Sequence, residues 1–316
     1  MTSSKARLGD CLRRGAFSGA RVALWLVSLV VPVSFLVAAL RYNGALQVMA
    51  RWIAPGFDLL GLPGESAVAF LTGGLVNCYS GIAAMGAIPL TSREITILAL
   101  MILFFHNIVV EAPVQQKTGS KAWILVLLRL FAALLSAIAL HHLLPPEVPS
   151  SPRPLPGPAT LAVTAPLGSY FLSWLDTTAR LVLKMGSLVI ALTILQRLLD
   201  EFRITRWLES LAAPLLRLMG LPRSVAFLWI VANTLGLAFG SAILISEYES
   251  GKLSPRDCQL LNLSVALCHS LLEDTLLFVA MGASALWITL PRILLASGVV
   301  WAYRAFSRSA SLTARQ

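Results

Sequence analysis

The sequence predicts an all-α polytopic membrane protein built from two tandem repeats. Of its 316 residues, 57% are hydrophobic and only 13% are charged, whereas a soluble domain carries about 25% charged residues. Several apolar stretches approach the roughly 20 residues that cross a bilayer as a helix. The same residue pattern also occurs twice along the chain. Together these observations exclude an ordinary soluble protein.

The internal repeat follows two constant spacings. In the downstream register, His106 corresponds to His269 and, without any gap, Glu111 corresponds to Asp274. In the upstream register the spacing is slightly shorter, and the sequence Gly-Leu-Pro at 61–63 recurs at 220–222. In an apolar chain such a repeat is typical of transporters, whose binding site lies between the two halves.

The repeat predicts five consecutive parts of the chain. They are a basic cytoplasmic tail (1–14), a first repeat (15–144), a Pro-rich linker (145–173), a second repeat (174–303) and a basic C-terminal tail (304–316). Successive prolines favour an extended linker over a helical one.

Each repeat is expected to hold the same elements in the same order. A spanning helix (22–40; 179–199) precedes an amphipathic segment with tryptophan and proline (44–60; 204–219), which suits the membrane interface. A Gly-rich segment follows (65–89; 224–246) and is expected to be re-entrant or broken, or else a tightly packed ordinary helix. Two more spanning helices complete each repeat (95–112 and 122–143; 258–280 and 284–303).

The positive charges predict the orientation of the repeats. Three spans per repeat would invert the second repeat relative to the first and place most Lys and Arg in the cytoplasm, as membrane proteins prefer. Four spans would put the arginines at 197–223 outside. We therefore expect inverted repeats in a bacterial-type inner (plasma) membrane, with both termini cytoplasmic. The net charge of +10 then reflects topology, and no nucleic-acid partner is predicted.

Ionisable residues repeat near the ends of two apolar helices. Such groups are costly in a membrane and usually face a bundle interior or a water-filled path. Asn107 and Glu111 are one helical turn apart, which predicts a shared helix face. The same holds for Ser270 and Asp274 and, on a second face, for His269 and Glu273. The candidate binding residues are His106, Asn107, Glu111, Arg129, His269, Ser270, Glu273, Asp274 and Arg292.

Two interpretations of these residues remain open. In the first, Arg129 pairs with Glu111 and Arg292 with Asp274, and the pairs fasten helices together. In the second, the two sets bind a substrate or coupling ion, and a carboxylate carries the proton or cation. The histidines then serve as hydrogen-bond partners or as ligands of a transition metal.

Two asparagines are weaker candidates for a binding site. The amides of Asn77 and Asn233 either contact a polar ligand or brace a helix break. The four cysteines have no spacing typical of a disulfide framework or a zinc site, so no resident metal or cofactor is expected. Hydrolase and nucleotide-binding motifs are absent, and no enzymatic activity is expected.

The sequence resembles the nucleoside recognition, or Gate, family of membrane proteins. The residues that carry the resemblance are 77–86 (Asn-Cys-Tyr-Ser-Gly-Ile-Ala-Ala-Met-Gly), 95–103, and 106–111 (His-Asn-Ile-Val-Val-Glu), with Lys117 and Gly119. Similar domains occur in concentrative nucleoside transporters, in B-type ferrous iron transporters and in sporulation membrane proteins. The Gly-Cys gate motif and the GTPase domain of the iron transporters are not recognisable here, which argues against iron transport.

The resemblance implies a transporter or permease-like protein that moves a small polar solute, nucleoside-like, or a cation through a site between two Gate repeats. The alternative is a non-transporting membrane scaffold similar to the sporulation proteins. Expected partners are the solute or cation, the lipid bilayer, and either a second copy of the chain or another membrane protein.

Overall fold

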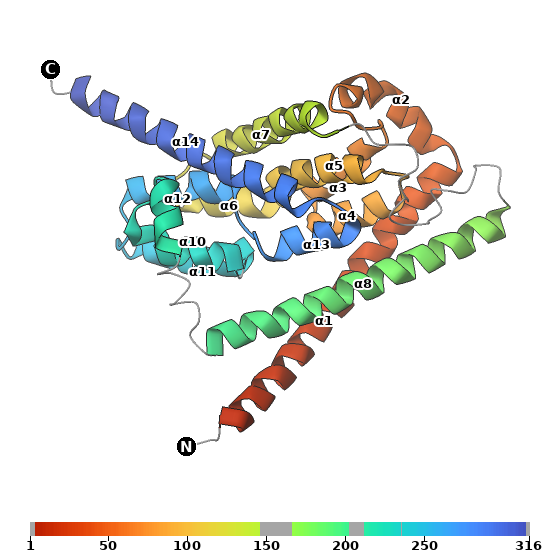
Figure 1. Ribbon diagram of the computed structural model, residues 1–316, viewed down its shortest axis with the longest axis horizontal. Helices are drawn as coiled ribbons and strands as arrows, with labels where there is room; N and C mark the ends of the chain where they lie inside the picture. The colour runs from red at the N-terminus through yellow and green to blue at the C-terminus, as the bar shows by residue number, and fades with distance from the viewer. Residues whose placement is uncertain (1–3, 146–165, 202–211, 235, 314–316) are drawn as a thin grey trace. The chain divides into compact units, whose positions relative to one another are not determined.

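The computed structural model describes residues 4–145, 166–201, 212–234 and 236–313. Within these ranges every regular element is a helix (Figure 1). Five helical stretches are long and apolar enough to span a membrane: Leu8–Tyr42, Ser92–Lys117 (α5 with α6), Ala122–Leu143, Leu167–Leu195 and Ala285–Ser307. The all-helical membrane class is thereby confirmed. Most of the predicted linker and part of the segment 204–219 lie outside the described residues.

The helices divide between two compact units. Unit 1 comprises Met1–Ile108, Ala133–Leu198 and Asp274–Ile288, and unit 2 comprises Val109–Ala132, Leu199–Glu273 and Thr289–Gln316. Each unit therefore contains sequence from both predicted repeats. Short segments are exchanged: α6 (Ile108–Lys117) belongs almost entirely to unit 2, and α13 (Glu273–Met281) almost entirely to unit 1.

In unit 1, the long helices α1 (Ser4–Tyr42) and α8 (Leu167–Glu201) pack side by side and antiparallel (Figure 1). The Tyr170 hydroxyl donates to the Ala38 carbonyl at 3.0 Å at one end. Toward the other end, a Cβ on Gly19 would lie 2.8 Å from Ile190 Cα. The absence of a side chain at Gly19 allows this close approach of the two backbones.

The remainder of unit 1 is a cluster of shorter helices. It consists of α2 (Ala45–Asp58), α3 (Ser66–Leu75), α4 (Cys78–Gly86) and α5 (Ser92–Phe105). Helix α3 packs on α4 and α5, and a Cβ on Gly81 would lie 3.1 Å from Gly73 Cα. The Gly-rich segment 65–89 is thus two short helices, with Asn77 accepting a hydrogen bond from the Ser80 N–H as the N-cap of α4.

Unit 2 also contains several short helices. They are η2 (Arg223–Val225), α10 (Ala226–Thr234), α11 (Gly236–Glu249) and α12 (Pro255–Leu267). The Trp229 indole donates to the Ser264 hydroxyl at 3.1 Å, which ties α10 to α12. The Asn262 amide donates to the Thr118 hydroxyl at 2.9 Å and to the Ser120 hydroxyl at 2.8 Å, and so holds the end of α6. Helices α7 (Ala122–Leu143) and α14 (Ala285–Thr313) have residues in both units.

Two predicted spanning helices are interrupted where the candidate residues lie. Helix α5 ends at Phe105, and Asn107 adopts the left-handed conformation (φ 59°) before α6 begins. Between α12 and α13, Ser270 has the same conformation (φ 48°). A left-handed residue cannot continue a right-handed helix. The predicted faces shared by Asn107 with Glu111, by Ser270 with Asp274 and by His269 with Glu273 are therefore wrong, and 258–280 is not one continuous span.

Large apolar side chains remain exposed on the long helices. On α7 they include Trp123, Leu127 and Phe131, each more than half exposed. A helix that is apolar on its outer face is suited to lipid and not to water. The long helices therefore offer a hydrocarbon-facing surface, as expected from the composition.

Candidate functional site

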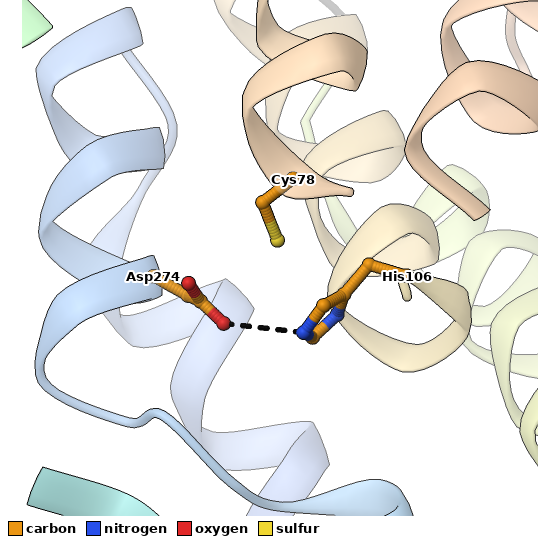
Figure 2. A group of neighbouring side chains, drawn as sticks. All are labelled: Cys78, His106 and Asp274. Carbon is orange, nitrogen blue, oxygen red and sulfur yellow. Dashed lines mark ion pairs between the residues drawn. The ribbon is translucent and has the colours of Figure 1, made fainter. Parts of the chain in front are cut away.

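In unit 1, three polar side chains from three helix ends point toward one another (Figure 2). Cys78 is the first residue of α4, His106 is the C-cap of α5, and Asp274 is the second residue of α13. All three are buried, with 3%, 3% and 7% exposure. Their ligating atoms lie within 4.8 Å of one another, and His106 Nε2 is 3.3 Å from Asp274 Oδ2.

The orientation of the His106 ring is set by the end of its own helix. Its Nδ1 lies 3.2 Å from the Ile102 carbonyl oxygen and 3.1 Å from that of Leu103. A carbonyl oxygen can only accept a hydrogen bond, so Nδ1 carries a proton and donates it. Nε2 is consequently directed at Asp274.

Unit 2 contains a second histidine–carboxylate pair. His269 Nδ1 lies 2.6 Å from the Val265 carbonyl oxygen, and its Nε2 is 3.1 Å from Glu111 Oε1. Arg129 Nη1 donates to Glu111 Oε2 at 2.7 Å. The Arg129–Glu111 pair is the one predicted from the sequence, and both residues are at most 4% exposed. The Glu111 carboxylate thus lies between the Arg129 guanidinium and the His269 imidazole.

Arg292 and Asp274 fall in different units, so their predicted pairing stays a prediction. Arg292 Nη2 donates to the His269 carbonyl oxygen, while Asp274 pairs with His106. The guanidinium is fully buried, and among the described residues of unit 2 its Nε and Nη1 have no hydrogen-bond partner. A carbonyl oxygen carries only a partial charge, so the charge of Arg292 is compensated less well than that of Arg129.

The pairing of histidines and carboxylates is reciprocal. His106 meets Asp274, and His269 meets Glu111. Each histidine therefore pairs with the carboxylate that follows the other histidine in the sequence. The break at Asn107 separates His106 from Glu111, which lie in different units. Each pair is buried and can hold a proton or another cation between its two members.

The remaining predicted residues have backbone or supporting contacts. Asn107 N–H donates to the Gly73 carbonyl at 3.3 Å, and Ser270 N–H donates to the Ala232 carbonyl at 3.1 Å. The Asn233 amide donates to the Trp229 carbonyl at 2.9 Å. Glu273 is the first residue of α13 and is half-buried. Asn77 caps α4, so the structure places both asparagines at helix ends or breaks, as one of the two interpretations held.

Cys78 was not among the predicted binding residues. The spacing of the cysteines does not indicate a metal site, and the two partners of Cys78 in its cluster come from helix ends far away along the chain. Only its position in the segment 77–86, already singled out by the family resemblance, pointed to a special role.

Comparison with known proteins assigns the class. The profile of the nucleoside recognition (Gate) family matches residues 23–139, which include His106, Glu111, Arg129 and Cys78. The chain belongs to this family of multi-pass membrane proteins.

Among curated proteins, the chain is similar to YvoD of Bacillus subtilis (strain 168), which is described as an uncharacterized membrane protein. The two are 30% identical over 273 residues, which cover 85% of this chain and 86% of YvoD. No solved structure matches the chain.

Proposed function

We propose that the protein is a membrane transporter that moves a small polar solute, nucleoside-like, or a cation by way of its buried histidine–carboxylate pairs. The observation that carries the proposal is the reciprocal pairing of His106 with Asp274 at 3.3 Å and of His269 with Glu111 at 3.1 Å. Buried ionisable groups are expensive in a membrane protein, and they commonly mark substrate or proton pathways.

The proposal includes two inverted repeats, and hydrogen bonds inside the two units support it. Asn107 N–H bonds to Gly73, and Ser270 N–H bonds to Ala232. The two donors correspond in the downstream register of the sequence repeat, and the two acceptors correspond in the upstream register. Left-handed glycines recur in the same way, at 61 and 220 and at 119 and 282. In the upstream register Asn77 corresponds to Gly236, so it does not correspond to Asn233.

Inverted repeats define the orientation that we propose. Three membrane crossings per repeat, with the Gly-rich segments re-entrant and the second crossing made by a broken helix (α5 with α6, and α12 with α13), leave both termini and most of the positive charge in the cytoplasm. The break between α3 and α4, where Asn77 caps α4, supports the re-entrant assignment of the first Gly-rich segment.

In this function a buried carboxylate carries the proton or cation, and Glu111 and Asp274 have different surroundings. Arg129 keeps Glu111 compensated at all times, whereas Asp274 faces an imidazole whose charge depends on bound protons or cations. We therefore assign the exchanging role to Asp274 and the anchoring role to Glu111.

The test is thermal stability of the purified protein in detergent with a panel of nucleosides, nucleobases and divalent cations. Wild type is compared with Glu111→Gln and Asp274→Asn, and with Asp176→Asn as a control, because Asp176 is an exposed carboxylate that pairs with Arg180 of the same helix, α8. A compound that raises the melting temperature of wild type and Asp176→Asn but not of Asp274→Asn supports the proposal. That compound is then tested for uptake into proteoliposomes.

A non-transporting scaffold, assembled with other membrane proteins or a second copy of the chain, makes the opposite prediction. No compound would then shift the melting temperature, and the carboxylate variants would differ from wild type only in stability. That result would replace the transporter proposal. We further propose that the protein is not an enzyme, because its sequence contains no hydrolase or nucleotide-binding motif.

A further inference from the structure

We propose that Cys78, His106 and Asp274 form a binding site for a divalent transition-metal cation of the zinc or cobalt kind. The site lies entirely within unit 1 and needs no assumption about transport. Its role as the site of the transported or coupled ion, in contrast, rests on the proposed function.

The donor set selects the class of ion. A thiolate, an imidazole and a carboxylate together favour borderline ions such as Zn²⁺ and Co²⁺, whereas Mg²⁺ and Ca²⁺ prefer oxygen ligands alone. Three protein ligands leave one coordination position open, as in zinc sites that exchange a water or a substrate. The four cysteines are thiols and not disulfides, so Cys78 is chemically able to serve as a ligand.

The separations of the ligating atoms fit such an ion. In tetrahedral coordination with Zn–N and Zn–O distances of about 2.0–2.2 Å, the two ligand atoms lie roughly 3.3–3.5 Å apart. The observed distance from His106 Nε2 to Asp274 Oδ2 is 3.3 Å. The Cys78 sulfur lies within 4.8 Å of both side chains, and a shift of about 1 Å brings it to the roughly 3.6 Å that a thiolate ligand requires.

Hydrogen bonding prepares His106 to be a ligand. Its Nδ1 donates to the carbonyls of Ile102 and Leu103, which in the neutral ring leaves a lone pair on Nε2. That lone pair faces a carboxylate oxygen, and two acceptors at this distance repel each other unless a cation or proton lies between them. A histidine that donates its other nitrogen to a carbonyl is the usual arrangement of metal-bound histidines.

The surrounding helices favour the charges of the other two ligands. Cys78 and Asp274 are the first and second residues of α4 and α13, and a helix N-terminus stabilises negative charge. In unit 2 the corresponding carboxylate, Glu111, already binds the Arg129 guanidinium, which occupies the place of a cation. In the upstream register of the repeat Cys78 corresponds to Leu237, and leucine has no ligand atom.

The experiment is a Co²⁺ titration of the purified full-length protein in detergent, followed by absorption spectroscopy. A thiolate bound to Co²⁺ gives a charge-transfer band in the near ultraviolet, and tetrahedral Co²⁺ gives intense visible bands. We expect both bands to saturate at one Co²⁺ per chain. Zn²⁺ should abolish them by displacement, and Mg²⁺ should not.

Variants assign the bands to the three ligands. A protein with Cys11→Ser, Cys258→Ser and Cys268→Ser, which keeps Cys78 as its only cysteine, should retain the charge-transfer band, and Cys78→Ser should lose it. His106→Gln and Asp274→Asn should each weaken Co²⁺ binding at least about 100-fold, beyond the roughly 10- to 100-fold that loss of an outer hydrogen-bond partner causes.

The proposal is overturned if wild type gives no charge-transfer band with excess Co²⁺, or if the band persists in Cys78→Ser. Cys78→Ser replaces one sulfur by oxygen, so it keeps the test decisive should His106→Gln fail to fold, which its elution profile and melting temperature would reveal. Uptake of Co²⁺ into proteoliposomes is measured separately. Binding without uptake would retain the metal site and remove the cation from the proposed transport function.

Discussion

Arg129 and Arg292 occupy corresponding positions and are 1% and 0% exposed, yet we expect them to respond differently to replacement by glutamine. Arg129 contacts the carboxylate of Glu111 at 2.7 Å. Arg292 donates to the carbonyl of His269, and two of its nitrogens have no partner among the described residues of unit 2. The perturbation is therefore chemically identical in the two variants, and only the surroundings differ.

The magnitudes follow from what each substitution leaves behind. Removing one member of a buried ion pair destabilises a protein by about 3–5 kcal/mol, because the other charge stays buried without compensation. In a membrane protein the unfolded reference state also finds partners for its polar groups, so we expect Arg129→Gln to lower the free energy of unfolding by about 3 kcal/mol. Arg292→Gln removes a poorly compensated charge and should change stability by less than about 1 kcal/mol, or increase it.

The assay is reversible unfolding by sodium dodecyl sulfate in mixed micelles, followed by the fluorescence of the protein's tryptophans. The double variant Glu111→Gln, Arg129→Gln should recover part of the loss, since it leaves no uncompensated carboxylate. Equal destabilisation by Arg129→Gln and Arg292→Gln would refute the reasoning. So would a double variant less stable than Arg129→Gln alone, because packing and not charge would then dominate.

Three further predictions concern the helices that position the site. Gly19→Ala should destabilise the protein by about 1–3 kcal/mol, because the new Cβ would lie 2.8 Å from the Ile190 backbone. The control is Gly9→Ala, whose Cβ would have nothing within 4 Å and which should be neutral or stabilising in the same unfolding assay. Asn107→Val should cost about 1–2 kcal/mol at its left-handed backbone, whereas Asn107→Gly should be tolerated; equal losses would contradict a conformational cause. Thr91→Ala should cost about 1 kcal/mol by removing the cap of α5, and an unchanged melting temperature would show that the cap is not needed.

Local chemistry explains why so much of the helical structure could be predicted. The lengths of α7 and of the central part of α1 follow from long, predominantly apolar stretches, which have no stable alternative to a helix in lipid. The start of α5 at Ser92 is marked by Thr91 and Glu94, which form a capping box. The breaks at Asn107 and Ser270 were harder to predict, because asparagine and serine also occur inside helices. Both residue types tolerate the left-handed conformation but do not require it.

The sequence by itself determined that the protein is a membrane protein, which residues recur, and that charged residues of both signs accompany the recurring histidines. Only the tertiary structure decided which groups meet. His106 is close to Glu111 in the sequence but pairs with Asp274. Cys78, on a third helix, lies beside His106 and Asp274. The physical reason is that a break in the backbone changes the direction of the following helix. The spacing of apolar residues along the sequence does not specify that new direction. Contacts between distant segments then depend on how α4, α5 and α13 pack together.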